Sequence, residues 1–200
     1  MATISYEPSG LPASSIAGRL FTAADLAAMP ELLPSGSVSY ELHHGVLVPM
    51  SPPVARHGNI QARFAYELIL QGEKRGLGKA YSEVGVLLER NLDHVLGPDA
   101  AFVMMRALPA LLTREGYLET IPQLIVEIRS KNETTKEIAE KVADYLKAGA
   151  ILVWVAEPTA ECVVEHRSGL PAKTYQKSDA LTCDDLIPGF HLPLAELFQQ

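Results

Sequence analysis

The segment Leu124–Ile128 constrains this chain most, because it places an acidic residue inside a buried strand. It is a short run of mostly apolar and β-branched residues, preceded by a proline and followed by polar residues. Such a run is typical of a strand buried on both faces. Burying the charge of Glu127 is costly unless a cation pairs with it. Strand alternation puts Arg129 on the same face as Glu127, so a carboxylate and a guanidinium are predicted side by side.

A second acidic residue precedes another strongly apolar segment. Asp99 comes directly before Ala100–Met104, which is also predicted to be a strand. Two strand-borne acids, one followed two positions later by a cation, form a pattern typical of metal-dependent phosphodiesterases. A structural ion pair between Glu127 and Arg129 is the simpler alternative, and a lone pair would favour it. The surrounding residues must distinguish the two.

Composition limits the class of protein. The chain has 200 residues, enough for one domain with a sizeable core, and its only cysteines, Cys162 and Cys183, form no CxxC pair. A zinc knuckle or disulfide scaffold is therefore disfavoured, and a cytoplasmic location is expected. No secretory leader and no run of about 18 apolar residues is present, so no membrane association is expected. With a net charge of -7, binding to nucleic-acid phosphates would need a local basic patch or bound cations.

The N-terminal part is predicted to be a flexible arm over residues 1–20, which are rich in Ser, Pro and Gly, followed by a single domain over residues 21–200. A short capped helix is expected from Thr22 to Met29. The turn His43-His44-Gly45 then predicts a β-hairpin, which would deliver Glu41 toward the rest of the domain.

A long helix is predicted from about Ala55 to Lys74, and its apolar stripe begins with polar residues. The stripe consists of His57, Ile60, Gln61, Phe64 and Leu68. The two polar members are either buried and satisfied by backbone partners, or they lie beside a polar site. After this helix, Ala80–Leu88 is predicted to be one long strand.

A second helix is predicted from the capping box Thr134–Glu137 to Lys147. Its apolar stripe comprises Ile138, Val142, Tyr145 and Leu146. Lys141 lies on the flank of this stripe, so its amine can either extend outward or reach toward the sheet. The remaining expectations are a strand, a C-terminal hairpin and a final helical turn, at Ile151–Ala156, Glu161–Gln176 and Leu194–Phe198.

The order of these segments is helix, strand, strand, strand, helix, strand. Such an αβββαβ order predicts an α/β fold whose mixed sheet is flanked by helices, because hairpin-like links join the first strands and a helical crossover joins the last pair.

The chain resembles the Uma-type restriction endonuclease family, within the PD-(D/E)xK nuclease superfamily. The resemblance spans roughly residues 20–198 and rests on seven motifs in the same order. They are Tyr40-Glu-Leu with Gly45-x-Leu-Val48; Met50-Ser-Pro-Pro53; Arg56-His-Gly-x-Ile60; Pro98-Asp-x-x-Phe102; Val126-Glu-Ile-x-Ser130; Lys141-x-x-x-Tyr145 with Val153-Trp-Val155; and Leu186-Ile-Pro-Gly-Phe190.

This resemblance implies a restriction-endonuclease-like core and a metal-dependent endonuclease that cleaves nucleic acid, with double-stranded DNA as the expected substrate. A homodimer is expected because cutting both strands of a duplex needs two active sites related by a two-fold axis. Asp99 and Glu127 would hold Mg²⁺, with Mn²⁺ as an alternative. Lys141 would be the catalytic cation that orients or deprotonates the water, and Arg129 would contact the scissile phosphate. Glu41 or Glu83 is expected to add an outer metal ligand or to hold the lysine. His57 is expected to contact the metal ligands or to transfer a proton.

One departure from the superfamily pattern leaves alternatives open. Superfamily nucleases have lysine two residues after the glutamate, where this chain has Arg129, and arginine holds its proton too tightly to act as a base. Lys141 is the expected substitute, and Lys131 is a weaker one because it lies beyond the strand end. The chain could instead be a degenerate nucleic-acid-binding module, or a metal-dependent hydrolase of a small phosphate ester.

Overall fold

The structure is a computed structural model, and it describes residues 19–29, 32–33, 36–37, 39–50, 52–109 and 116–199. Residues 1–18, which make up most of the predicted N-terminal arm, lie outside the described residues.

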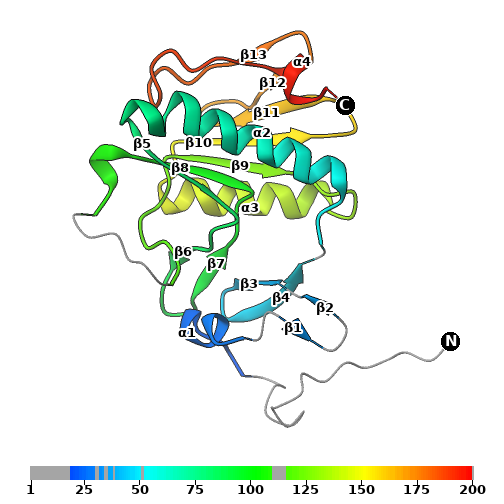
Figure 1. Cartoon of the computed structure of the whole chain (residues 1–200). Helices are drawn as coiled ribbons and strands as arrows, with labels where there is room; N and C mark the ends of the chain where they lie inside the picture. The colour runs from blue at the N-terminus through cyan, green and yellow to red at the C-terminus, as the bar shows by residue number, and fades with distance from the viewer. Residues whose placement is uncertain are drawn as a thin grey trace, which may run out of the picture.

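The core is a six-stranded mixed sheet in the order β12-β11-β10-β9-β8-β5 (Figure 1). Strands β9 and β10 are parallel, and every other pair in this sheet is antiparallel. The strands are β5 (Gly78–Ser82), β8 (Ala100–Met104), β9 (Leu124–Ile128), β10 (Leu152–Glu157), β11 (Cys162–His166) and β12 (Lys173–Tyr175). Both central segments singled out by their apolar runs are thus core strands.

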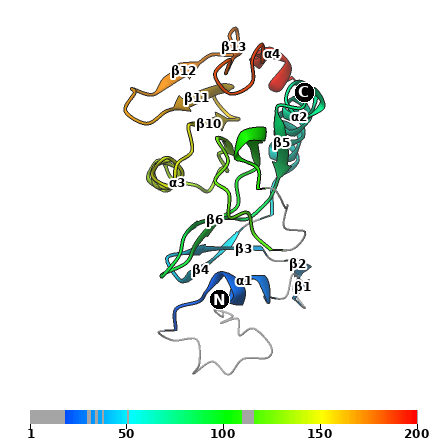
Figure 2. The ribbon, with the colours of Figure 1, turned by 90° about the vertical axis from the view of Figure 1, so that its left-hand side faces the viewer.

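Two helices cover opposite faces of this sheet (Figure 2). Helix α2 (Ala55–Gln71) buries the predicted stripe residues Ile60, Phe64 and Leu68. Helix α3 (Thr135–Ala148) covers the other face and begins at the predicted capping box, in which Thr134 and Glu137 bond reciprocally. The order α2, β5, β8, β9, α3, β10 confirms the αβββαβ core.

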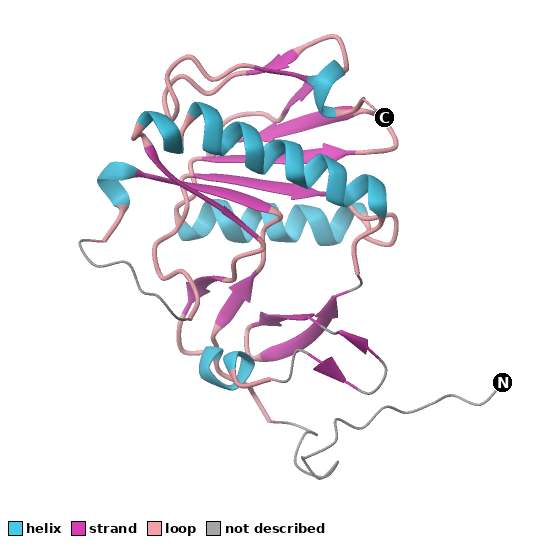
Figure 3. Ribbon diagram, in the orientation of Figure 1, coloured by secondary structure: helices cyan, strands magenta, loops and turns pink. Residues whose placement is uncertain are grey.

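A second sheet lies beside the core, in the order β4-β3-β7-β6 (Figure 3). Its strands are β3 (Ser39–His43), β4 (Val46–Met50), β6 (Val86–Glu89) and β7 (His94–Leu96). Strands β3 and β4 form the predicted hairpin, and its turn residues His44 and Gly45 both have positive φ, at 48° and 82°. Helix α1 (Ala23–Ala27), capped by Thr22, packs next to β3, and the short pair β1 (Leu32–Leu33) and β2 (Gly36–Ser37) is a separate ribbon.

The prediction of a single strand over Ala80–Leu88 is wrong. The chain leaves the core sheet after Ser82 and enters the second sheet at Val86, so that β5 and β6 belong to different sheets. Glu83 adopts a left-handed conformation with φ 51° at the break. Gly85 packs so closely on Tyr117 that a Cβ would lie 2.3 Å from its ring. This contact comes from a distant part of the chain, which explains why local apolar pattern alone gave the wrong element.

The C-terminal segment packs on the α2 side of the core sheet. This segment follows β12 and contains the predicted helical turn, here α4 (Leu194–Leu197), together with the pair β13 (Ala180–Leu181) and β14 (Leu192–Pro193). The predicted β11–β12 hairpin forms one edge of the core sheet itself. Trp154 is fully buried between Phe64 and Phe190 in this layer. Two 3-10 turns complete the described elements, η2 (Glu73–Arg75) and η3 (Met105–Ala107). Within the described residues, no helix is long and apolar enough to cross a membrane.

Candidate active site

The two acids expected on neighbouring strands are brought together. Asp99 directly precedes β8, and Glu127 lies in β9. The two strands are antiparallel with Ala100 paired to Val126, so the next position along the pair places Asp99 opposite Glu127. The Oδ2 atom of Asp99 accepts a 2.6 Å hydrogen bond from the backbone N–H of Ile128. This bond ties the Asp99 carboxylate to the strand end that carries Glu127.

Lys141 points from α3 into the same region. Its Nζ lies 3.2 Å from Glu41 Oε1, 3.4 Å from Glu133 Oε1 and 3.9 Å from Glu127 Oε2. Only 9% of the lysine side chain is exposed, so the amine reaches toward the sheet and does not extend outward. Glu133, in the turn before α3, was not among the residues that sequence reasoning selected.

Tyr145 is the other residue that sequence reasoning missed in this role. Its hydroxyl donates a 2.6 Å hydrogen bond to Glu127 Oε1, and both residues are buried. The sequence placed Tyr145 in the apolar stripe of α3 and in the motif Lys141-x-x-x-Tyr145, but gave no partner for its hydroxyl. Its position one helical turn after Lys141 is the signal that could have found it, because a buried tyrosine hydroxyl normally has a hydrogen-bond partner.

Burial and charge shift the protonation of Glu127 and Lys141 strongly. Burial, reinforced by the charges of Asp99 and Glu41, raises the pKa of Glu127 to about 8, although the Lys141 ammonium and the Tyr145 hydrogen bond act in the opposite direction. Burial would lower the pKa of Lys141, but the surrounding carboxylates outweigh it and raise that pKa. The lysine is therefore a firmly held cation at neutral pH.

Glu41 is an ionised carboxylate shared by several donors. Its Oε1 accepts from the backbone N–H of Gly97 at 3.1 Å and contacts Lys141, and its Oε2 lies 3.0 Å from His43 Nε2. Burial alone would raise the pKa of Glu41, but the bonds from His43 and Gly97 and the charge of Lys141 lower it overall. The hairpin thus delivers Glu41 to the lysine, as expected.

The first turn of α2 lies beside the acids, which decides between the two alternatives for its polar residues. His57 Nε2 lies 2.7 Å from Asp99 Oδ1. Burial lowers the pKa of His57, but the hydrogen bond and charge of Asp99, together with Glu133 and Glu83, raise it overall. Gln61 donates to Glu83 Oε1 at 3.0 Å and to the Asp99 carbonyl at 3.1 Å. Glu83 therefore reaches the site through Gln61.

Arg129 is directed away from the acidic pair. Strand β9 ends at Ile128, and the Arg129 guanidinium pairs with Glu157 at 3.1 Å and bonds the Glu133 carbonyl and the Thr135 hydroxyl. Among the described contacts it has none with Asp99 or Glu127. Arg129 therefore stabilises the turn between β9 and α3. Glu133 lies in this turn and contacts Lys141.

The balance of charge in this cluster suits a hard cation. The acidic side chains outnumber the basic ones, because four carboxylates surround one lysine and one histidine: Glu41, Asp99, Glu127 and Glu133 with Lys141 and His57. Carboxylate and backbone carbonyl oxygens are the ligands that Mg²⁺ prefers. The residues present therefore fit a divalent metal ion held by Asp99 and Glu127.

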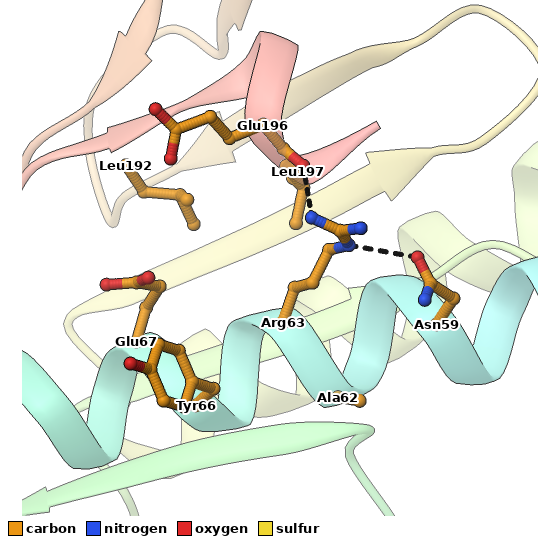
Figure 4. A pocket seen from close by; sticks show the side chains of 8 residues that line it. All are labelled: Asn59, Ala62, Arg63, Tyr66, Glu67, Leu192, Glu196 and Leu197. Carbon is orange, nitrogen blue, oxygen red and sulfur yellow. Dashed lines mark hydrogen bonds between the residues drawn. The ribbon is translucent and has the colours of Figure 1, made fainter. Parts of the chain in front are cut away.

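A shallow hollow between α2 and the C-terminal segment is a different feature (Figure 4). Arg63 crosses it, donating to Asn59 Oδ1 at 2.9 Å and to the Glu196 carbonyl at 2.7 Å. None of the acidic-cluster residues lines it. These bonds fasten α4 to α2 and have no part in the candidate active site.

Comparison with known proteins identifies the family and the fold. The family model described as "Putative restriction endonuclease", Uma2, matches residues 24–195. The structure is similar to the crystal structure of "a putative nuclease belonging to DUF820" from Anabaena variabilis, with a TM-score of 0.75 and 18% identity over 89% of this chain and 97% of that one. No curated protein matches the chain. The fold is restriction-endonuclease-like, and the chain belongs to the Uma2 family.

Proposed function

We propose that this protein is a metal-dependent endonuclease that hydrolyses phosphodiester bonds in DNA. The observation that carries the proposal is the Lys141 ammonium, which is held between Glu41 on the second sheet and Glu127 on the core sheet. Glu127 in turn lies opposite Asp99 on the neighbouring strand. A buried lysine beside two strand-borne acids is the arrangement expected of a nuclease that activates water near a metal. Family membership supports the same reaction class.

The proposed metal ligands are the Asp99 and Glu127 carboxylates and the backbone carbonyl of Ile128. Mg²⁺ is the expected ion, and Mn²⁺ suits the same oxygen donors. When bound, the metal lowers the pKa of a coordinated water and offsets charge that develops on the phosphate.

The protein's own residues then supply orientation and charge. Lys141 keeps its proton, so it would orient the attacking water and stabilise negative charge and would not remove a proton itself. Tyr145 fixes one oxygen of Glu127, and His57 fixes one oxygen of Asp99. Because the pKa of His57 is raised, it is also suited to transfer a proton close to the reacting phosphate.

With a net charge of -7, nucleic acid as the substrate requires local basic side chains, which we place at one end of the core sheet. Helices α2 and α3 begin at this end, and strands β9 and β10 finish there. The basic residues at this end are Arg56, Arg129, Lys131 and Lys177. Arg56 and Lys177 pair with Glu161, and Arg129 pairs with Glu157, so contact with DNA phosphates would require exchange of these ion pairs.

We infer that the active form is a homodimer. Cleaving both strands of a duplex requires two active sites, and a two-fold axis is the commonest way to supply them. The hairpin β3–β4 and the segment before it are the proposed contact. Light scattering at the assay concentration tests this inference, and a monomer that still cuts both strands would contradict it. A cytoplasmic site of action agrees with two buried, free cysteines.

The decisive experiment is a cleavage assay on supercoiled, linear and single-stranded DNA with Mg²⁺ or Mn²⁺. We expect cleavage only with metal and none with Glu127→Gln, which keeps the size of the side chain. Metal-independent DNA binding without cleavage would instead identify a degenerate binding module. Hydrolysis of a small phosphate ester, with a substrate affinity that does not depend on salt concentration, would instead identify a metal-dependent phosphate-ester hydrolase.

A further inference from the structure

A second cluster of potential metal ligands lies outside the acidic site. One ligand atom each from His44, His94 and Asp144 lies within 4.8 Å of the other two. His44 is in the exposed turn of the β3–β4 hairpin, His94 is a buried residue of β7, and Asp144 is on α3. Three separate elements therefore contribute to this cluster, and none of its residues belongs to the proposed nuclease site.

The hydrogen bonds of His94 show an excess of acceptors. Its Nδ1 lies 3.1 Å from the Leu42 carbonyl, and its Nε2 lies 3.1 Å from Asp144 Oδ2. Both partners can only accept, whereas a neutral imidazole has one N–H to donate. A second proton would satisfy both partners, but it would place a charged imidazolium at a side chain that is only 2% exposed.

A metal ion would satisfy the same atoms without a second proton. The Nδ1–H of His94 would donate to Leu42, which leaves Nε2 free to coordinate, and such a bond to a backbone carbonyl is usual for metal-binding histidines. Asp144 would supply an oxygen and His44 a second nitrogen. The rings of His44 and His94 are stacked at 4.3 Å, so the exposed His44 ring must turn out of the stack to coordinate.

We infer that His44, His94 and Asp144 form a binding site for a transition-metal ion of the Zn²⁺ class, separate from the proposed Mg²⁺ site. Two imidazoles and one carboxylate are a common zinc ligand set, with a water in the fourth position. Mg²⁺ prefers all-oxygen ligands and would bind weakly here. The two sites are thus distinguished by ligand chemistry.

Such an ion would clamp α3 to the second sheet. Asp144 lies one turn after Lys141 on α3, and His44 directly follows β3, the strand that carries Glu41. The distance between Lys141 and Glu41 depends on the same packing of helix against sheet. The ion would hold this packing without touching the reacting groups.

The test is a Co²⁺ titration, because Co²⁺ replaces Zn²⁺ and gives visible absorption bands that change with its ligands. The full chain carrying Glu127→Gln is used, so that the acidic site contributes little binding. In this background we compare His44→Ala, Asp144→Asn and the control His191→Ala, which removes an exposed histidine from another part of the surface. His44 is exposed and Asp144 is only partly buried, so both variants should fold, as circular dichroism would verify.

We expect one equivalent of Co²⁺ to bind, to be displaced by Zn²⁺ and to resist excess Mg²⁺. His44→Ala and Asp144→Asn should each weaken binding about tenfold or more, and His191→Ala should leave it unchanged. Zn²⁺ should also raise the melting temperature of the parent more than that of either variant. Absence of stoichiometric binding, or equal binding in all variants, would overturn the inference. The experiment measures metal binding and not cleavage. Failure of the inferred metal site would therefore leave the proposed nuclease activity untouched.

Discussion

Tyr145 and Glu127 are joined by a 2.6 Å hydrogen bond between the helix α3 and the central strand β9. The carboxylate is fully buried, and the tyrosine hydroxyl is one of the groups that lowers its otherwise raised pKa. The bond therefore links the packing of α3 to the protonation of the proposed metal ligand.

Tyr145→Phe should consequently raise the pKa of Glu127 further. We expect the acid limb of the pH profile for metal-dependent cleavage to move to higher pH, and the free energy of unfolding to fall by about 1–3 kcal/mol. The control is Tyr66→Phe, which alters an exposed hydroxyl on α2. A loss of stability with an unmoved pH profile would show that Tyr145 is only structural.

The pH dependence of metal binding follows from Glu127 itself. Its pKa is raised to about 8, so metal must displace a proton below that pH. We expect the apparent Mg²⁺ or Mn²⁺ affinity to increase as pH rises, by up to about tenfold per unit until pH 8, with proton release detectable by calorimetry in two buffers. An affinity that does not change between pH 6 and about 8 would contradict the assignment of Glu127.

The stability of the metal-free protein should show the opposite trend. Because the pKa of Glu127 in the folded protein lies above its ordinary 4.5, the folded protein binds this proton more tightly than the unfolded chain. The contribution is fully present below about pH 4.5 and is lost as pH rises toward 8. Denaturant unfolding of the parent and Glu127→Gln should therefore diverge across this window, and parallel curves would argue against the shift.

Lys141→Met should abolish most turnover while metal binding persists. Methionine keeps the packing of the lysine stem but removes the only lysine ammonium described between Glu41, Glu127 and Glu133. We expect cleavage to fall by about a hundred- to a thousandfold. Lys136→Met, on the exposed side of α3, is the matched control and should cleave normally.

Arg129 should tolerate replacement better than Lys141. Arg129→Lys should retain or increase activity, because it restores the superfamily residue. Arg129→Met should cost about 1 kcal/mol of stability through the lost contacts to Glu157 and Thr135, with cleavage reduced less than tenfold. If Arg129→Met is inactive and Lys141→Met cleaves like the parent, the roles of these two residues are reversed.

Local patterns were sufficient to predict the core. The apolar run over Leu124–Ile128 coincides with β9, and the capping box at Thr134 starts α3, since both depend on residues close in sequence. The two acids could be paired because their strands are neighbours in the predicted order. Lys141 was found because its helical position allowed only two directions for the amine.

Features that depend on distant contacts could not be predicted in this way. The break at Glu83 depends on the packing of Gly85 against Tyr117. Alternation ceased to apply at Arg129 because β9 ends one residue earlier. Periodicity identified the ring of Tyr145 as apolar but contained no information about its hydroxyl, whose partner lies on another element.

The proposed role of Lys141 implies that the protein can act only after Glu41 and Lys141 have paired. These residues are separated by one hundred positions, and Glu41 belongs to the second sheet. A nascent chain emerging from the ribosome can form the hairpin early, but its acidic cluster lacks the cation until α3 has been synthesised and docked. The incomplete chain is therefore not expected to cleave nucleic acid until most of its length has been synthesised.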